Sequence, residues 1–148
     1  MTERLQIGGY EIEFDRDATV AAYSHITVPS PENCGCAYCR NWVAGREHAV
    51  PPEATELLSK LGIPVNGEIE TYEYPGTSKP HGYGGWYMFV GCILSKPSDE
   101  AKGFGPLTFG MGFTSGKSFR VPAFDNHNTC ELEFYTELDE YLLPEDYK

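Results

Sequence analysis

The chain has 148 residues, of which 41% are hydrophobic and 14% aromatic. This length suits one domain, predicted over residues 1–148, and the composition is too apolar for a disordered chain. The formal net charge of -11 repels phosphate backbones and anionic lipid headgroups, so neither nucleic acid nor a membrane surface is an expected partner.

The first segment, LQIGGYEIEF (residues 5–14), alternates apolar and polar residues on both sides of a Gly-Gly pair. Two glycines between alternating arms predict a two-residue hairpin turn. In the next segment Asp17 is expected to cap a short helix over residues 17–23, although a strand fits almost as well. The two prolines of TVPSPEN then interrupt regular structure.

Two helices are predicted after this loop. One continues from the cysteine-rich segment through AYCRNWVAGRE and ends near Gly45. The other, PPEATELLSKLG, has proline in its first turn, acidic residues near its N-terminus and a glycine that stops it. Its apolar residues recur at i, i+3, i+4 and i+7, which predicts one buried face. That face consists of Ala54, Leu57, Leu58 and Leu61.

Strands and turns are predicted after Gly62, in EIETYEY, GGWYMFVGCIL, PLTFGMGF and CELEFYTEL. The last of these alternates, so one face is expected to be buried and the other solvated. The buried face holds Cys130, Leu132 and Phe134, and the solvated face Glu131, Glu133 and Tyr135. The 16 glycines and 11 prolines also favour β-rich structure. The predicted fold class is α+β, with an antiparallel sheet and short helices of the N-terminal half packed on it.

Three cysteines lie within six positions of the segment NCGCAYCRNW: Cys34, Cys36 and Cys39. The N-terminus lacks the basic and apolar regions of a signal peptide, and the longest apolar run, WYMFVGCIL, is too short to cross a membrane. A cytoplasmic location is therefore expected. In that compartment clustered cysteines are more typical of metal or catalytic sites than of disulfides.

Zinc is one expected cofactor. Tetrahedral zinc takes four thiolate or imidazole ligands, and a C-x-x-C motif commonly supplies two of them. Cys36 and Cys39 have this spacing, and the intervening glycine lets Cys34 fold back so that the three sulfurs share one space. In the segment HNTC, His127 and Cys130 have the spacing of a second ligand pair. Further candidates are His25, His48, His81 and Cys92. The alternative is that no metal binds and the cysteines pack as small apolar groups.

Thiol redox chemistry is a second hypothesis. A C-x-x-C at a helix start has its thiolate stabilised by the helix N-terminus, and Arg40 adds positive charge. Against this, thioredoxin-like proteins carry the motif after a strand in a βαβ pattern, whereas a proline-bearing loop precedes it here. A cysteine-based enzyme is a related alternative, but no G-x-S-x-G, P-loop or H-E-x-x-H motif is present.

Aromatic residues stand among glycines in HGYGGWYMFVG, which contains Tyr83, Trp86 and Tyr87. Exposed aromatic side chains beside a glycine-rich segment are expected to contact a peptide or another ligand. The alternative is that these rings pack in the core. Glu131 and Glu133 have a spacing that fits paired glycosidase carboxylates, but solvated strand faces routinely carry such pairs.

The segment FDRDATVAAYSHITVPSPENCGCAYCRNW resembles the start of an uncharacterised bacterial family of small cytosolic proteins with a C-x-C-x-x-C-x-N-aromatic motif. The LGI turn at 61–63 and the segment GGWYMFVG extend the resemblance over residues 5–94. It implies no known activity, substrate or catalytic residue. The residues that carry it are Thr19, Tyr23, Cys34, Cys36, Cys39, Asn41 and Trp42.

The favoured hypothesis is a small acidic cytosolic module, non-enzymatic, that binds a protein, a peptide or another ligand. Zinc would hold its three-cysteine loop in place. The alternative is a thiol redox switch or a cysteine-based enzyme that uses Cys34, Cys36 and Cys39.

Overall fold

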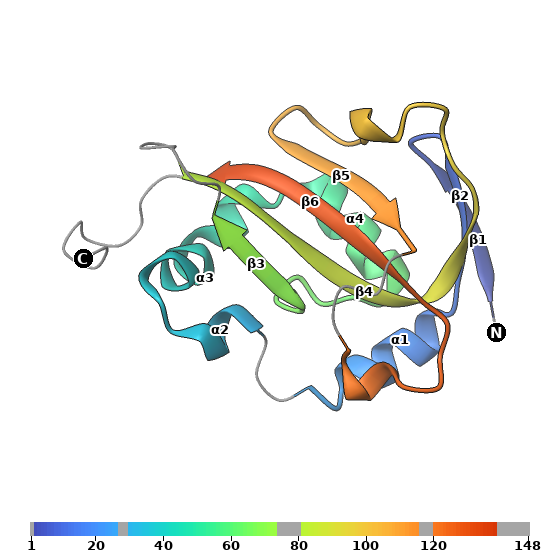
Figure 1. The fold of residues 1–148 in the computed structure, drawn as a ribbon, viewed down its shortest axis with the longest axis horizontal. Coiled ribbons are helices and arrows are strands. Elements are labelled where there is room, and N and C mark those ends of the chain that lie inside the picture. The colour runs from blue at the N-terminus through green and yellow to red at the C-terminus, as the bar shows by residue number, and fades with distance from the viewer. Residues whose placement is uncertain (1, 27–29, 74–80, 116–119, 139–148) are drawn as a thin grey trace.

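The computed structural model describes residues 2–26, 30–73, 81–115 and 120–138. Within these ranges, helices pack on a six-stranded antiparallel sheet, which confirms the predicted α+β class (Figure 1). The helices are α1 (Arg16–Tyr23), α2 (Ser30–Cys34), α3 (Ala37–Ala49) and α4 (Pro52–Leu61), with short 3-10 helices η1 (Glu100–Lys102) and η2 (Pro122–Phe124). The strands are β1 (Glu3–Ile7), β2 (Tyr10–Phe14), β3 (Glu70–Glu73), β4 (His81–Ser95), β5 (Phe109–Thr114) and β6 (Thr129–Leu138).

The sheet is organised around β4, which is 15 residues long. The strand order is β1-β2-β4-β6-β5, and β3 also pairs with β4. One edge of β4 pairs with β6, while the other edge pairs with β3 near its start and with β2 near its end. The predicted hairpin is confirmed: Gly8 and Gly9 form its turn with φ values of 59° and 83°, a region that favours glycine.

Side chains of helix α1 form hydrogen bonds with the backbone of β4 along the part of its edge that lies between β3 and β2. The Tyr23 hydroxyl donates to the carbonyl of Met88 at 2.7 Å and accepts its N–H at 3.1 Å. The Thr19 hydroxyl accepts the N–H of Val90 at 2.9 Å. Buried backbone groups need such partners, so these two side chains replace the missing strand and fix α1 against the sheet.

Helix α4 has the predicted buried face, since Ala54, Leu57, Leu58 and Leu61 are all buried. Its C-terminus is also as predicted. Gly62 has φ of 86°, and its N–H donates to the carbonyls of Leu58 and Ser59. Helix termination by a left-handed glycine is common because no Cβ opposes that conformation.

The other helices differ from the sequence-based expectation in their bounds. Helix α1 is capped by Asp15, whose carboxylate accepts the N–H of Ala18 at 3.0 Å, and not by Asp17. Helix α2 forms in a segment that was expected to be irregular; residues 27–29 lie outside the described residues. Helix α3 continues past Gly45 to Ala49 because Gly45 belongs to its buried stripe.

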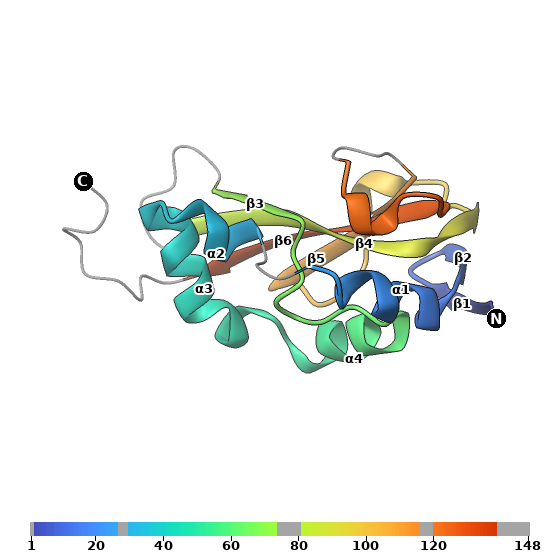
Figure 2. The ribbon, with the colours of Figure 1, turned by 90° about the horizontal axis from the view of Figure 1, so that it is seen from below.

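Figure 2 shows α1, α3 and α4 on one side of the sheet and η2 on the other. The core between helices and sheet receives Cys130, Leu132 and Phe134 from β6, as predicted. The opposite face of β6 was expected to be solvated, and for Glu131 this is wrong, because its exposed fraction is 1%. Glu131 pairs with Met88, which lines a hollow together with Phe124 of η2, so this end of the face is covered.

Among the described residues, no helix combines the length and apolar character needed to cross a bilayer.

Candidate metal centre

The three cysteines come together where α2 meets α3. Cys34 is the last residue of α2, Cys36 is the N-cap of α3, and Cys39 lies in the first turn of α3. Gly35 has φ of 74°, which lets the chain reverse between the two helices. The three sulfur atoms lie within 4.8 Å of one another. The predicted shared space for the three sulfurs is therefore confirmed.

The cysteine cluster, defined as Cys34, Cys36 and Cys39, has an exposed and a buried side. Cys34 and Cys36 are exposed, whereas Cys39 is buried and its sulfur lies 4.0 Å from the hydroxyl oxygen of Thr71 on β3. The Cys36 sulfur accepts the N–H of Cys39 at 3.4 Å, as an N-cap side chain does. The cluster is thus fixed to the sheet on one side and open to solvent on the other.

The surroundings separate the acidities of the thiols. Partial burial raises the pKa of Cys36, but the N–H of Cys39 and hydrogen bonds with Cys34 and Cys39 outweigh it, so this pKa lies below its ordinary value. Burial, followed by hydrogen bonding to Cys34 and Cys36, raises the pKa of Cys39 well above its ordinary value. Of these two thiols, Cys36 is therefore the one that ionises more readily.

Two residues that follow the cysteines anchor α3 to the sheet. Asn41 is 0% exposed, and its amide donates to the hydroxyl of Tyr83 at 3.2 Å. That hydroxyl donates in turn to the carbonyl of Tyr38 at 2.9 Å. Trp42 is also fully buried, and its ring stacks on Phe134 at a centroid distance of 5.3 Å. These contacts fix the start of α3, and with it the position of the cluster.

A buried ion pair lies further along α3. Arg46 approaches the Glu68 carboxylate at 2.9 Å, and the indole N–H of Trp42 donates to the same carboxylate. Burial raises the pKa of Glu68, and the charge of Arg46 and the Trp42 hydrogen bond oppose this rise only in part. The pair was not predicted from the sequence. The available signal was the i, i+4 spacing of Trp42 and Arg46, which places them on one helix face.

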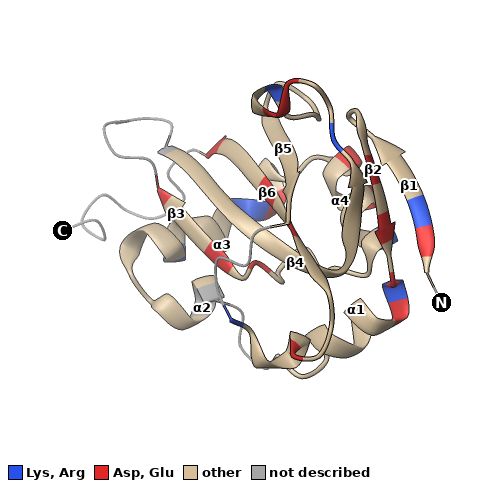
Figure 3. Cartoon of the chain, turned by 45° about the vertical axis from the view of Figure 1, so that its right-hand side comes forward, with Lys and Arg blue, Asp and Glu red and all other residues tan. Residues whose placement is uncertain are grey.

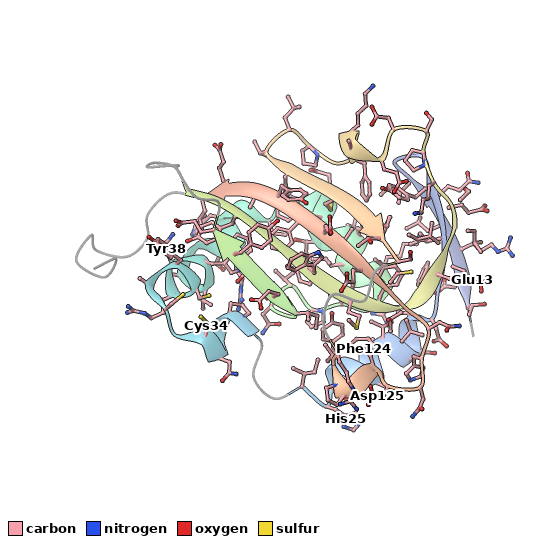
Figure 4. All side chains as sticks on the ribbon, viewed as in Figure 1. Glu13, His25, Cys34, Tyr38, Phe124 and Asp125 are labelled. Carbon is pink, nitrogen blue, oxygen red and sulfur yellow. The ribbon has the colours of Figure 1, made fainter. Side chains whose placement is uncertain are left out.

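His127 and Cys130 do not lie beside the cysteine cluster. Cys39 contacts Thr71, which pairs with Gly85 of β4, whereas the Cys130 sulfur donates to the carbonyl of Gly91 at 3.4 Å. Gly85 and Gly91 are six positions apart along β4, which is about 20 Å. His127 is exposed in the turn after η2. Figure 4 shows Phe124, the last residue of η2, and Asp125, which follows it, near α1 and far from Cys34.

The remaining ligand candidates whose side chains the structure describes also lie apart from the cluster. His25 and His48 are exposed, after α1 and near the end of α3 respectively. Cys92 lies on β4 near Cys130. Burial raises the pKa of Cys130 to about 11, and the charge of the Cys92 thiolate adds to this rise. The side chain of His81 lies outside the described part of the structure. Among the described side chains, no other histidine, cysteine or carboxylate joins the three sulfurs.

Two of the three aromatic residues predicted to contact a partner lie in the core. Tyr83 and Tyr87 are each 1% exposed, and the Tyr87 hydroxyl donates to the carbonyl of Val65 at 2.8 Å. Alternation along β4 turns both rings toward the helices, so they cannot meet a partner at the surface. Trp86 points to the opposite face, where it is partly exposed.

The chain matches no family model, no curated protein and no solved structure. The resemblance to the uncharacterised bacterial family therefore stays a prediction. What the structure does show is that Cys34, Cys36 and Cys39 are close enough to bind a metal ion.

Proposed function

We propose that the cysteine cluster binds one zinc ion, and that the protein is a non-enzymatic binding module whose loop between α2 and α3 is held by that ion. The observation that carries this proposal is the separation of the three sulfurs, at most 4.8 Å. Zinc–sulfur bonds of about 2.3 Å in tetrahedral geometry place sulfurs about 3.8 Å apart. A contraction of about 1 Å therefore completes three bonds.

The local electrostatics support a bound cation. The N-terminus of α3, a helix of 13 residues, stabilises negative charge on the Cys36 sulfur. Three thiolates around one zinc ion carry a net charge of about −1, which this helix end favours. A zinc ion would also remove the need to keep the Cys39 thiol protonated, because a coordinating thiol loses its proton.

A water molecule or an external ligand would fill the fourth zinc position. Such a ligand would reach the ion from the side of Cys34 and Cys36, which is exposed. Sites with three protein ligands and one open position exchange ligands more readily than closed four-ligand sites. The proposed role is therefore a zinc site that can accept a donor from a partner.

Zinc content and zinc affinity test this proposal. Protein purified without chelator should contain about one zinc equivalent, and removal of zinc should lower the melting temperature because metal binding stabilises the folded state. Cys34→Ser and Cys36→Ser change exposed residues and should each weaken zinc binding by at least about tenfold. Cys92→Ser and His127→Ala are the controls and should bind zinc like the wild type.

A thiol redox switch is the second candidate function. The observation that favours it is the contrast between Cys36, which is exposed with a lowered pKa, and Cys39, which is buried with a raised pKa. The Cys36 thiolate would attack a disulfide of an oxidised partner protein, and Cys39 would then displace the partner's sulfur from Cys36. The Cys36–Cys39 disulfide forms as the partner's disulfide is reduced to two thiols. Protein without zinc that forms a Cys36–Cys39 disulfide, reversible by dithiothreitol, would favour this candidate.

A further inference from the structure

The side of the sheet opposite α3 and α4 is covered only in part by the described residues. At one end η2 packs near Met88, which is 2% exposed. At the other end the strand register places Trp86 beside Glu70 on β3 and beside Glu133 on β6. All three of these side chains are partly exposed. The neighbouring positions on the same face are Tyr72 and Tyr135.

We call this set the aromatic–acidic face: Glu70, Tyr72, Trp86, Glu133 and Tyr135. The indole N–H of Trp86 donates to one carboxylate oxygen of Glu133 at 2.8 Å, and the Tyr135 hydroxyl donates to the other at 3.2 Å. The ring of Tyr72 lies 5.4 Å from that of Trp86. Two ring edges are thus held against one carboxylate, while Tyr135 remains 44% exposed.

Glycines lower the surface beside this face. Gly110 and Gly112 of β5 pair with Tyr135 and Glu133. A Cβ added at Gly110 would find only the Tyr135 carbonyl within 4 Å, at 3.9 Å, and one at Gly112 only the hydroxyl of Tyr10, at 3.7 Å. Because Gly110 and Gly112 carry no side chain, the surface of β5 is low beside Glu133 and Tyr135. We call these two glycine positions the shelf of β5, on which an extended chain has room to lie.

The charge of the region indicates the kind of ligand. Figure 3 shows acidic positions along β3 and β6, and the chain has a net charge of -11. Aromatic rings attract cations through their quadrupole, more strongly when the ring is partly desolvated. A guanidinium group can stack on a ring and donate to a carboxylate at the same time, which an ammonium group does less well.

We propose that the aromatic–acidic face binds an arginine-bearing peptide segment of a partner protein. One guanidinium stacks on Tyr135 and pairs with Glu133, and the extended segment lies along the shelf of β5. This inference deepens the proposed binding role, and it does not depend on zinc. A second copy of the chain is a poor occupant, because two surfaces of the same negative charge repel each other.

Fluorescence anisotropy with the full chain tests the proposal. The probe is a fluorescein-labelled nonapeptide of alternating glycine and arginine, measured at about 0.15 M salt to limit long-range attraction. Matched peptides with lysine or glutamate replace the arginines. We expect binding of the arginine peptide, binding of the lysine peptide weaker by about threefold or more, and no binding of the glutamate peptide. Equal affinity for arginine and lysine, or no binding of either, would overturn the proposal.

Substitutions test whether the peptide binds at the aromatic–acidic face. Tyr135→Leu keeps apolar bulk but removes the ring, and should weaken binding about fivefold, whereas Tyr135→Phe should bind like the wild type. Glu133→Gln should weaken binding about tenfold. Glu47→Gln removes an equal charge from an exposed side chain of α3, and Tyr38→Ala removes an equally exposed ring; both should leave binding unchanged.

Three outcomes would overturn this placement. Equal losses in Glu133→Gln and Glu47→Gln would mean non-specific attraction to an acidic protein. A dimer in light scattering that dissociates in Tyr135→Leu would mean that a second copy occupies the face. Cys34→Ser, which tests only the zinc proposal, should retain the peptide affinity. A loss of peptide affinity in Cys34→Ser would mean that the peptide binds at the cysteine cluster instead.

Discussion

Thr19, Tyr23, Asn41 and Trp42 are buried and hydrogen-bonded inside the protein. Thr19 and Tyr23 complete the edge of β4, and Asn41 and Trp42 fix α3 to the sheet. Among the residues that carry the family resemblance, Cys34 and Cys36 are different, because their side chains are exposed. Packing explains the four buried residues, so the exposed cysteines are the part of the motif that calls for a chemical role.

The reactivity of Cys36 is the first prediction at this scale. Because the pKa of Cys36 is lowered, its thiolate fraction in zinc-free protein should rise at a lower pH than that of an ordinary thiol, whose pKa is 9.0. Iodoacetamide should therefore alkylate Cys36 with a midpoint below pH 9.0, and should leave Cys39 unmodified at that pH because its pKa is raised. Peptide mass mapping across a pH series measures both. Faster alkylation of Cys39 than of Cys36 would contradict the described contacts.

The ion pair of Arg46 and Glu68 gives the second prediction. Arg46→Met leaves the Glu68 carboxylate buried without its cation, and should lower the free energy of unfolding by about 3–5 kcal/mol at neutral pH. The loss of Arg46 raises the pKa of Glu68 further, so the folded variant binds a proton more readily than the unfolded chain. The loss of stability should therefore shrink as the pH falls toward 4.5, the ordinary pKa of this carboxyl.

Urea unfolding at several pH values measures this effect. Arg4→Met is the control, because Arg4 is exposed and lies 3.6 Å from Glu13 in a surface pair. It should change stability by less than about 1 kcal/mol. A loss in Arg46→Met that is equally small, or that grows at acid pH, would show that Glu68 is not held by this cation.

At the scale of elements, α4 offers the simplest test of packing. Leu58 is 1% exposed on the buried face of this helix, so Leu58→Ala should lower the free energy of unfolding by about 2–5 kcal/mol. Glu56→Ala on the exposed face should change it by less than about 0.5 kcal/mol. Chemical denaturation compares the two variants. A loss below about 0.5 kcal/mol for Leu58→Ala would mean that this face is not packed.

Elements with strong local patterns were predictable from the sequence. Helix α4 has a proline start, a 3.6-residue period and a glycine end, and the β1–β2 hairpin has Gly-Gly between alternating arms. Helix α2 was missed because prolines usually interrupt structure, although proline is tolerated in a first helical turn. Helix α3 was shortened at Gly45 because the glycine suits a helix end as well as a buried stripe.

At the scale of the whole molecule, the cysteine cluster was predictable only in its local part. The spacing of Cys34, Cys36 and Cys39 limits their sulfurs to a small volume. The spacing of His127 and Cys130 suggested a second ligand pair, but tertiary register decides where that pair lies. All of β6 pairs with the His81–Val90 part of β4. This register carries the Cys130 sulfur to Gly91, about 20 Å along β4 from Gly85, the partner of Thr71 beside the cluster. The local sequence pattern around His127 and Cys130 does not predict that distance, because it depends on how β6 pairs with β4.

Strand β3 connects the two proposed sites. Thr71 faces the helices and contacts Cys39, while its neighbours Glu70 and Tyr72 belong to the aromatic–acidic face. Alternation along one strand thus places the cysteine cluster and the aromatic–acidic face, the proposed zinc and peptide sites, on opposite sides of the sheet. The burial of Tyr83 and Tyr87 follows from the same alternation, which leaves Trp86 as the aromatic residue of β4 available to a partner.

The measurement that tests the central claim most directly is the intact mass of the protein under native and denaturing conditions, with thiols counted in each state. Zinc bound by the cysteine cluster predicts a native mass higher by one zinc ion. It also predicts a denatured mass with all five cysteines reduced. In the native state the exposed thiols of Cys34 and Cys36 should react only after chelator is added. A native mass without metal, with less than about a tenth of an equivalent of zinc in protein purified without chelator, would contradict the claim. A denatured mass lower by two hydrogens would instead indicate a disulfide.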